Sequence, residues 1–176
     1  MEYDCEAPLL RVRLVPFSQL ITLACPSPST PGNALVVRTE GRARSDAAPV
    51  LAAGPALSSA PLVVLVNDHT ASASEIAAGA LRDNCRAVLA GGPRTYGKGL
   101  IQSVYELSDG SGLVLTVGRY LTPAGTDIDL EGLRADFGGL PAPADADATL
   151  RACKLERGRG GGLDGGGGAA PAVPTR

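Results

Sequence analysis

Apolar residues form two short continuous runs in the middle of the chain. PLVVLVN at 61–67 and RAVLAGG at 86–92 are almost wholly apolar, which is typical of strands that are buried on both faces. Between them, apolar residues recur on one face of a helix, namely Ile76, Ala77, Ala80 and Leu81. The pattern therefore predicts a βαβ unit, with two parallel strands joined by a helix over about 73–82 and a right-handed crossover.

Three further segments have the character of strands. GLIQSVYEL at 99–107 and GLVLTVGRYL at 112–121 flank the turn SDGS, whose Asp109-Gly110 pair is a hairpin signal. We therefore expect residues 100–107 to pair with residues 113–121. Upstream, ALVVRTEG at 34–41 has β-branched residues and ends at a glycine, so it predicts one more strand.

The two ends of the chain carry no such pattern. The chain has 23 glycines and 14 prolines among 176 residues, about twice ordinary usage. We expect residues 1–31 to be irregular and unassigned, and 138–176 to be an Ala/Pro/Gly-rich flexible tail. The pattern thus predicts one α/β core, over 32–137.

Composition excludes several classes of function. A formal net charge of −2 gives no electrostatic case for a nucleic-acid partner, and a single histidine excludes a His-rich metal site. The cysteines are scattered without a CxxC pair, which argues against a zinc site and against a disulfide scaffold: Cys5, Cys25, Cys85 and Cys153. No apolar run is long enough for a membrane-spanning helix. Acidic residues near the start do not favour a cleavable signal peptide.

Hydroxyl groups lie where the first apolar strand meets the predicted helix. In NDHTASASEIAAGAL, Ser72 or Ser74 would sit at the helix N-terminus, where unpaired N–H groups and the helix dipole favour an anion. Ser72-Ala73-Ser74-Glu75 is also an S-x-x-E capping box, which needs no catalysis. The motif by itself favours the cap over a nucleophile.

A lysine between two glycines is the second candidate. Lys98 in TYGKGLIQ lies on a turn that leads into a strand, and a lysine desolvated there could act as a neutral general base. A surface turn lysine is the commoner alternative. Gln102 could point back at its amine. His69, beside Asp68 and three residues before Ser72, is the rival base, although a solvated loop histidine is the commoner case.

Taken in order, these motifs resemble the carboxy-terminal processing peptidases, also called tail-specific proteases. VLVN, TASASEI, the DN-x-RA segment, the TYGKG turn, the DGS hairpin and YLTPAG follow one another within residues 61–137, the best-matching part of the chain. The cyanobacterial and chloroplast type, which matures the photosystem II reaction-centre precursor, is the most similar. The resemblance implies a ClpP/crotonase-like core of βαβ units with an added β-hairpin, incomplete at its N-terminal side.

The resemblance also implies a role for each candidate residue. Ser72 would be the nucleophile of a Ser-Lys dyad and Lys98 its general base, oriented by Gln102. The backbone N–H of Ala73 would be one oxyanion donor. Two acidic residues match positions that support the site, Glu75 and Asp83. No metal and no cofactor is implied.

Several departures from the family pattern accompany the match. The spacing from Asp83 to Lys98 is one residue longer than expected, and Ala135 stands where the family usually has proline. A PDZ-like domain, and the upstream glycine turn that supplies the second oxyanion donor, have no counterpart in this sequence. We therefore expect a truncated catalytic core that by itself cleaves peptides barely above background.

The sequence thus predicts a serine-type endopeptidase that cleaves near the C-termini of protein or peptide substrates through an acyl-enzyme. The alternative is a catalytically impaired remnant that acts as a peptide-binding or interaction module. A crotonase relative that handles acyl-CoA rests on fold analogy alone. The family suggests the thylakoid lumen or the bacterial periplasm.

Overall fold

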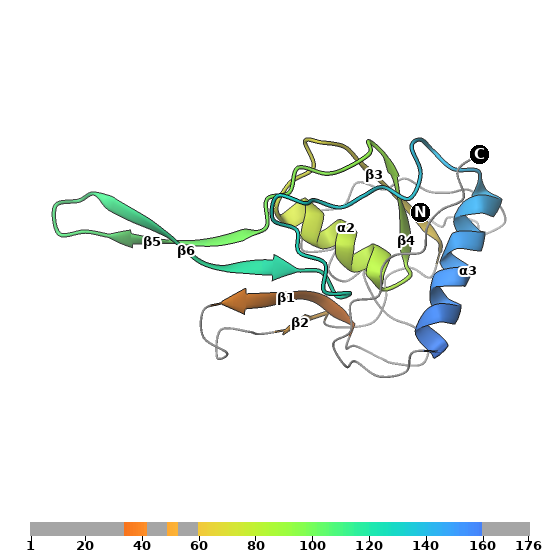
Figure 1. Cartoon of the computed structure of the whole chain (residues 1–176), viewed down its shortest axis with the longest axis horizontal. Coiled ribbons are helices and arrows are strands. Elements are labelled where there is room, and N and C mark those ends of the chain that lie inside the picture. The colour runs from red at the N-terminus through yellow and green to blue at the C-terminus, as the bar shows by residue number, and fades with distance from the viewer. Residues whose placement is uncertain (1–33, 42–48, 53–59, 160–176) are drawn as a thin grey trace, which may run out of the picture.

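The computed structural model describes residues 34–41, 49–52 and 60–159. The predictions for 1–31 and for the last part of the tail, 160–176, lie outside the described residues. In chain order the elements are β1 (Leu35–Gly41), β2 (Pro49–Leu51), β3 (Leu62–Val66), α2 (Ala73–Asp83), β4 (Ala87–Gly91), β5 (Leu100–Glu106), β6 (Gly112–Leu121) and α3 (Pro143–Arg159) (Figure 1).

The predicted βαβ unit is confirmed. Strands β3 and β4 pair in parallel, with Val64 opposite Leu89, and α2 connects them. Val88, Leu89 and Ala90 are almost completely buried, as a continuous apolar run requires. The side chain of Asp136 also binds strand β4, because its Oδ2 accepts the N–H of Leu89 at 2.7 Å.

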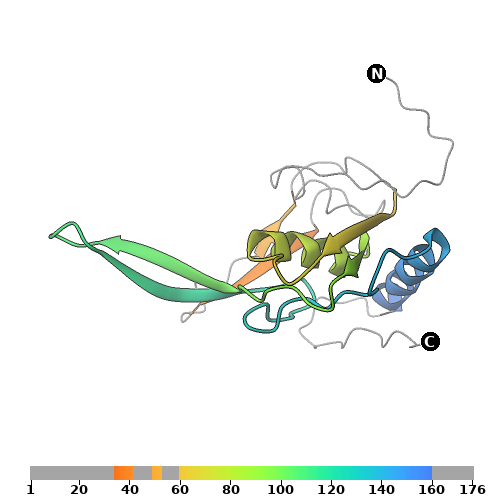
Figure 2. The same ribbon diagram turned by 90° about the horizontal axis from the view of Figure 1, so that it is seen from above.

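The other strands form a separate antiparallel sheet in the order β2-β1-β6-β5. The predicted hairpin is confirmed, since β5 and β6 pair around Asp109-Gly110 with Val104 opposite Val114. Strand β1 ends at Gly41, opposite Gly118 of β6, so the outer part of the hairpin continues as two strands. Both views show this part projecting far from the body of the molecule (Figures 1 and 2).

Helix α2 lies at the centre of the packing. One buried cluster joins its residues Ala80 and Leu81 to Val36 and Val37 of β1. Another joins Ala78 of α2 to β3, β4 and the loop after β6, through Val66, Leu89, Ile128 and Leu133. Because α2 is packed against these elements, the residues of its first turn have a fixed position in the fold.

The predicted patternless tail is wrong for residues 143–159, which form α3. The segment begins with a proline, which suits the first helical position, and has no further glycine or proline until Gly158. Ala146 and Leu150, four residues apart, are buried against Val63, Val88 and Ala90. The helix was missed because the glycine-rich residues that follow it dominate the composition of residues 138–176.

The sequence argued against a disulfide scaffold, and the structure contains a disulfide that this argument did not anticipate. Cys85, just after α2, is bonded to Cys153 of α3 across 68 residues. Few and scattered cysteines argue against a disulfide-rich scaffold, but they do not exclude one bridge that the fold brings together. Within the described ranges, no helix is long and apolar enough to cross a membrane.

Burial raises the pKa of Asp136, only partly offset by the Leu89 N–H and by the charge of Arg82. A carboxyl group whose pKa is higher in the folded state than in the unfolded state keeps its proton longer when folded, so its contribution lowers the free energy of unfolding as pH rises. An asparagine at this position would still accept the Leu89 N–H but would not titrate.

We therefore expect Asp136→Asn to gain stability relative to the unmodified chain as pH rises from about 4, the ordinary aspartate value. Urea unfolding of both proteins between pH 4 and pH 7 measures this difference. Asp109→Asn is the matched control of opposite sign, because hydrogen bonds from Ser111 lower the pKa of Asp109. Relative stabilisation of Asp136→Asn that falls with pH would contradict the account.

Candidate active site

The loop after β3 is shaped by its own side chains. Asn67 Oδ1 accepts the N–H of His69 at 3.1 Å, and Thr70 Oγ1 accepts the N–H of Asn67 at 3.1 Å. These local bonds replace sheet pairing and turn the chain from β3 toward α2. The loop therefore delivers Ser72 to the start of the helix in one defined conformation.

Ser72 has an unusual backbone conformation. It is the N-cap of α2, but with φ of 55° and ψ of −120° it lies outside the extended region that N-cap residues normally adopt. A non-glycine residue at such a φ carries strain on the order of 1–3 kcal/mol. Strained serines on sharp strand-to-helix turns are typical of nucleophiles, because the turn presents the hydroxyl beyond the helix end.

The first turn of α2 supplies an open hydrogen-bond donor. Ser74, Glu75 and Ile76 donate their N–H groups to the carbonyls of Ala71 or Ser72. In the part of the chain that the structure describes, the N–H of Ala73 has no acceptor. It therefore fits an oxyanion beside Ser72, where the helix dipole adds a partial positive charge.

The Lys98 turn is packed closely against the loop after β6. A Cβ on Gly99 would collide with the backbone N of Asp129, and one on Gly97 would lie 3.0 Å from the backbone of Leu130. Gly97 also has a positive φ of 86°. The two glycines beside Lys98 are therefore required by close backbone approach.

One buried carboxylate joins the serine turn to the lysine turn. Glu75 is 0% exposed. Its Oε2 accepts the N–H of Ser72 at 2.8 Å and the N–H of Lys98 at 2.9 Å. Its Oε1 accepts the N–H of Gly97 at 2.7 Å. The Glu75 half of the capping box is therefore formed, while the Ser72 side chain makes no cap hydrogen bond. The Glu75 carboxylate also reaches a second turn 22 residues away, which a helix cap alone does not need.

Thr95 completes this arrangement and was missed by the sequence reasoning. Its hydroxyl donates to Glu75 Oε1 at 2.5 Å and accepts the N–H of Leu133 at 2.7 Å. Thr95 is only 4% exposed. Thr95 is the first residue of the TYGKG motif, so its position in that motif is the sequence feature that could have indicated a role.

The other predicted residues lie in different surroundings. Gln102 is exposed and follows a β-bulge between Ile101 and Gln102 on β5. Asp83 lies at the opposite end of α2 from Ser72, about 16 Å along the helix axis, and its carboxylate accepts the N–H of Ala124 at 2.9 Å. Asp83 therefore holds the turn after β6 and does not contact the serine or lysine turns.

The backbone N–H groups of Ser72 and Lys98 meet at the same Glu75 oxygen, but no hydrogen bond of the described residues joins their side chains. Ser72 is half-buried and Lys98 is exposed. Among the hydrogen bonds of the described residues, none joins Ser72 Oγ to Lys98 Nζ or to the imidazole of His69. Tyr96 N–H does donate to Thr70 O at 2.9 Å, which ties the loop before Ser72 to the turn before Lys98.

The sequence profile described as "Peptidase family S41" matches residues 26–138 of the chain. The chain belongs to peptidase family S41. The matched region contains the turn with Ser72, the turn with Lys98 and the β5–β6 hairpin. The site described above therefore lies within the region that matches family S41.

Named relatives agree with this assignment. The chain is 52% identical over 120 residues to "Carboxyl-terminal-processing peptidase 1, chloroplastic" of Arabidopsis thaliana, covering 68% of this chain and 24% of that protein. It is 68% identical over 109 residues to peptidase 2 of the same name and organism, covering 57% and 21%. A relative from Tetradesmus obliquus, "C-terminal processing peptidase, chloroplastic", is 60% identical over 96 residues, covering 53% and 20%.

The fold is also similar to that of a solved structure. The structure titled "Photosystem II D1 C-terminal processing protease" matches with a TM-score of 0.58 and 43% identity, covering 72% of this chain and 31% of that one. The chain thus spans about a quarter or less of the curated relatives it matches.

Proposed function

We propose that this chain carries the catalytic serine and lysine of a peptidase that cleaves near protein C-termini. The observation that carries the proposal is the Glu75 carboxylate, which binds the backbone N–H groups of both Ser72 and Lys98. A shared buried acceptor fixes two turns relative to each other, as a two-residue reaction centre needs. The names of the relatives support the choice of C-terminal processing.

In the proposed mechanism Lys98, in its neutral form, takes the proton of the Ser72 hydroxyl. The Ser72 oxygen attacks the carbonyl carbon of the scissile peptide bond, and the oxyanion accepts a hydrogen bond from the N–H of Ala73. Collapse of the intermediate breaks the C–N bond, and Lys98 returns the proton to the leaving amine. Water then hydrolyses the acyl-enzyme.

Two features of the site assign further roles. Because Lys98 is exposed in the described part of the chain, we propose that bound peptide desolvates it and so favours the neutral form. Gln102 is four residues downstream on β5, and in this proposal it orients the lysine amine when substrate is bound. Apo geometry is often looser than the reacting geometry, which fits the unbonded dyad.

The fold and compartment complete the proposal. The β3-α2-β4 unit supports a ClpP/crotonase-like core with β5 and β6 as the added hairpin. Three of the relatives are chloroplastic, and the Cys85–Cys153 disulfide suits an oxidising compartment. We therefore place the protein in the thylakoid lumen, with protein or peptide C-termini as its substrates.

The second candidate is a catalytically impaired family member that binds peptides. The absence of a Ser72–Lys98 hydrogen bond among the described residues favours it. A chimera separates the two functions. Residues 60–137 replace the matching segment of Arabidopsis carboxyl-terminal-processing peptidase 2, and turnover of a fluorogenic C-terminal peptide is measured. The peptidase proposal predicts turnover within about tenfold of the parent; binding of the peptide without turnover supports the remnant.

A further inference from the structure

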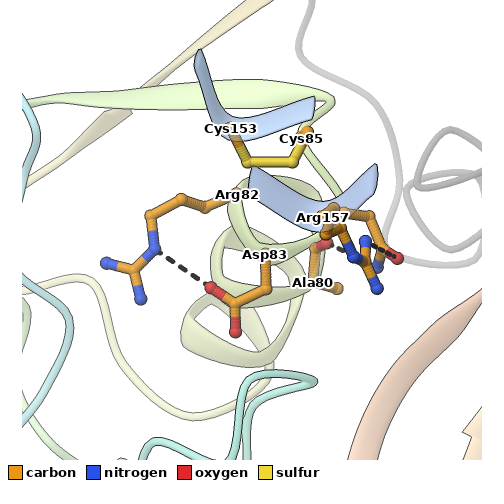
Figure 3. Close-up of a disulfide and its surroundings, with 7 residues drawn as sticks. Ala80, Arg82, Asp83, Cys85, Cys153 and Arg157 are labelled. Atoms are coloured by element: carbon orange, nitrogen blue, oxygen red, sulfur yellow. Dashed lines mark hydrogen bonds and ion pairs between the residues drawn. A yellow bond between two sulfur atoms is a disulfide. The ribbon is translucent and has the colours of Figure 1, made fainter. Parts of the chain in front are cut away.

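The Cys85–Cys153 disulfide connects the end of α2 to the second half of α3. Cys85 follows the last turn of α2, and Cys153 lies in the second half of α3, with their Cα atoms 5.7 Å apart. In the close-up, the bridge crosses from the end of α2 to the ribbon of α3, and Arg157 lies beside the same helix end (Figure 3). The bridge therefore lies at the contact between α2 and α3.

The two halves of α3 are held in different ways. In the first half, Ala146 and Leu150 are buried against β3 and β4. From residue 151 to residue 157 every side chain is exposed except Cys153, which is half-buried, and Leu155 is 65% exposed. Besides the disulfide, the polar contact that joins this half to the rest of the described chain is an exposed hydrogen bond from Arg157 to Asn84 at 3.0 Å. The second half of α3 thus depends on the bridge.

The α2 side of the bridge has its own support. Cys85 N–H donates to Arg82 O at 2.8 Å and Arg86 N–H to Leu81 O at 2.9 Å, which closes the helix end. Asn84 Nδ2 donates to Leu35 O at 2.8 Å and so ties the same turn to β1. These bonds do not need the disulfide, so opening it leaves the end of α2 in place.

The conformation of Cys85 indicates that the bridge itself is the reason for a cysteine here. Its φ of 55° is left-handed, at the position after a helix where glycine is the usual residue. A side chain there is unfavourable unless it makes a compensating contact. The compensating contact of Cys85, which is 2% exposed, is the bond to Cys153.

We propose that Cys85–Cys153 is a redox latch that docks the second half of α3 and releases it on reduction. A thiolate of an incoming dithiol attacks Sγ of Cys153, the more accessible partner, and the Cys85–Cys153 bond breaks. Cys85 leaves as a thiolate and takes up a proton. The second thiol of the dithiol then displaces Cys153, so the dithiol is oxidised to a disulfide and both cysteines become thiols.

The latch is independent of the proposed peptidase activity, because it concerns α3 and not the serine turn. In an oxidising compartment the second half of α3 is docked on the core. After reduction it is free, whereas β3, α2 and β4 keep their packing, since the contacts of Ala146 and Leu150 and the α2 cap are unchanged. Release is therefore local and reversible.

The test is amide hydrogen exchange of the full 176-residue chain with Cys5→Ser and Cys25→Ser, so that only the bridge cysteines remain. Dithiothreitol is expected to speed exchange at residues 152–157 at least tenfold and to change exchange in β3, α2 and β4 less than twofold. Reoxidation with oxidised glutathione is expected to restore the slow exchange. Alkylation mapped by peptide mass spectrometry confirms that both thiols appear on reduction.

Two variants keep the interpretation unambiguous. Cys153→Ala is expected to show the released exchange pattern with and without dithiothreitol. Cys85→Gly, which also relieves the left-handed φ, is expected to show the same pattern with a core at least as protected as in the reduced parent. Exchange at residues 152–157 that does not respond to reduction would overturn the proposal. Reduction that speeds exchange in β3, α2 and β4 as much as in α3 would overturn it as well, because the disulfide would then stabilise the whole fold.

Discussion

Replacing Ser72 by alanine in the chimera should lower the kcat for tail-peptide hydrolysis by about 10⁴-fold or more, the size of effect that removing a serine nucleophile has elsewhere. Lys98→Met should lower kcat by about 10³-fold, since a general base contributes about 10²–10⁴. Both variants should leave peptide affinity and the thermal midpoint nearly unchanged, because neither side chain is part of a buried cluster.

The controls for this experiment come from the same segment of the chain. Ser74 is an exposed hydroxyl two residues from Ser72, and His69 is the rival base. Arg94 is a cation four residues before Lys98, and its ion pair with Glu131 lies at the surface. Ser74→Ala, Arg94→Met and His69→Ala should each retain turnover within about threefold. A chimera that stays active with Lys98→Met but fails with His69→Ala would replace the lysine by the histidine as the base.

Glu75→Gln should lower both the stability and the turnover of the chimera, although it only replaces one carboxylate oxygen by an NH₂ group. Four donors converge on the two carboxylate oxygens, namely the N–H groups of Ser72, Gly97 and Lys98 and the hydroxyl of Thr95. An amide offers one oxygen, and its NH₂ group must face at least one of the buried N–H donors. We expect a loss of about 3 kcal/mol in the free energy of unfolding and about 10²-fold or more in kcat.

Urea unfolding and peptide turnover of the chimera check both effects, with Glu131→Gln as the control. Glu131 is exposed and its ion pair with Arg94 lies at the surface, so this variant should change stability by less than about 0.5 kcal/mol. A double-mutant cycle of Glu75→Gln with Thr95→Val should show strong coupling, since the two side chains share a hydrogen bond. Additive effects would mean that Glu75 does not join the two turns.

The parts of the fold that were predictable are those determined by local pattern. Two apolar runs with a one-sided helix between them specify β3, α2 and β4, and Asp109-Gly110 specifies the hairpin. The glycines at 97 and 99 are plain in the sequence, but the partner that approaches them closely is not. That partner, the backbone around Asp129 and Leu130, lies about 30 residues downstream and has no signal in the pattern itself.

The parts that were missed depend on long-range pairing. Cys85 and Cys153 are separated by 68 residues, and nothing in either local sequence names the other as its partner. The convergence of Thr95 and Lys98 on Glu75 likewise could not be read from the S-x-x-E motif, which explains only the bond to Ser72. Helix α3 was missed because Ala146 and Leu150, the helix residues in its buried cluster, are too few to form a recognisable apolar period.

If Ser72 is an activated nucleophile, a fluorophosphonate probe should label it, and peptide mass spectrometry locates the label. The probe forms a covalent bond only with an activated hydroxyl and does not require a known substrate. In the chimera we expect one adduct, on Ser72, which is absent in Ser72→Ala, strongly reduced in Lys98→Met and retained in Ser74→Ala. An adduct on Ser74, or no adduct on a folded chimera, would contradict the account.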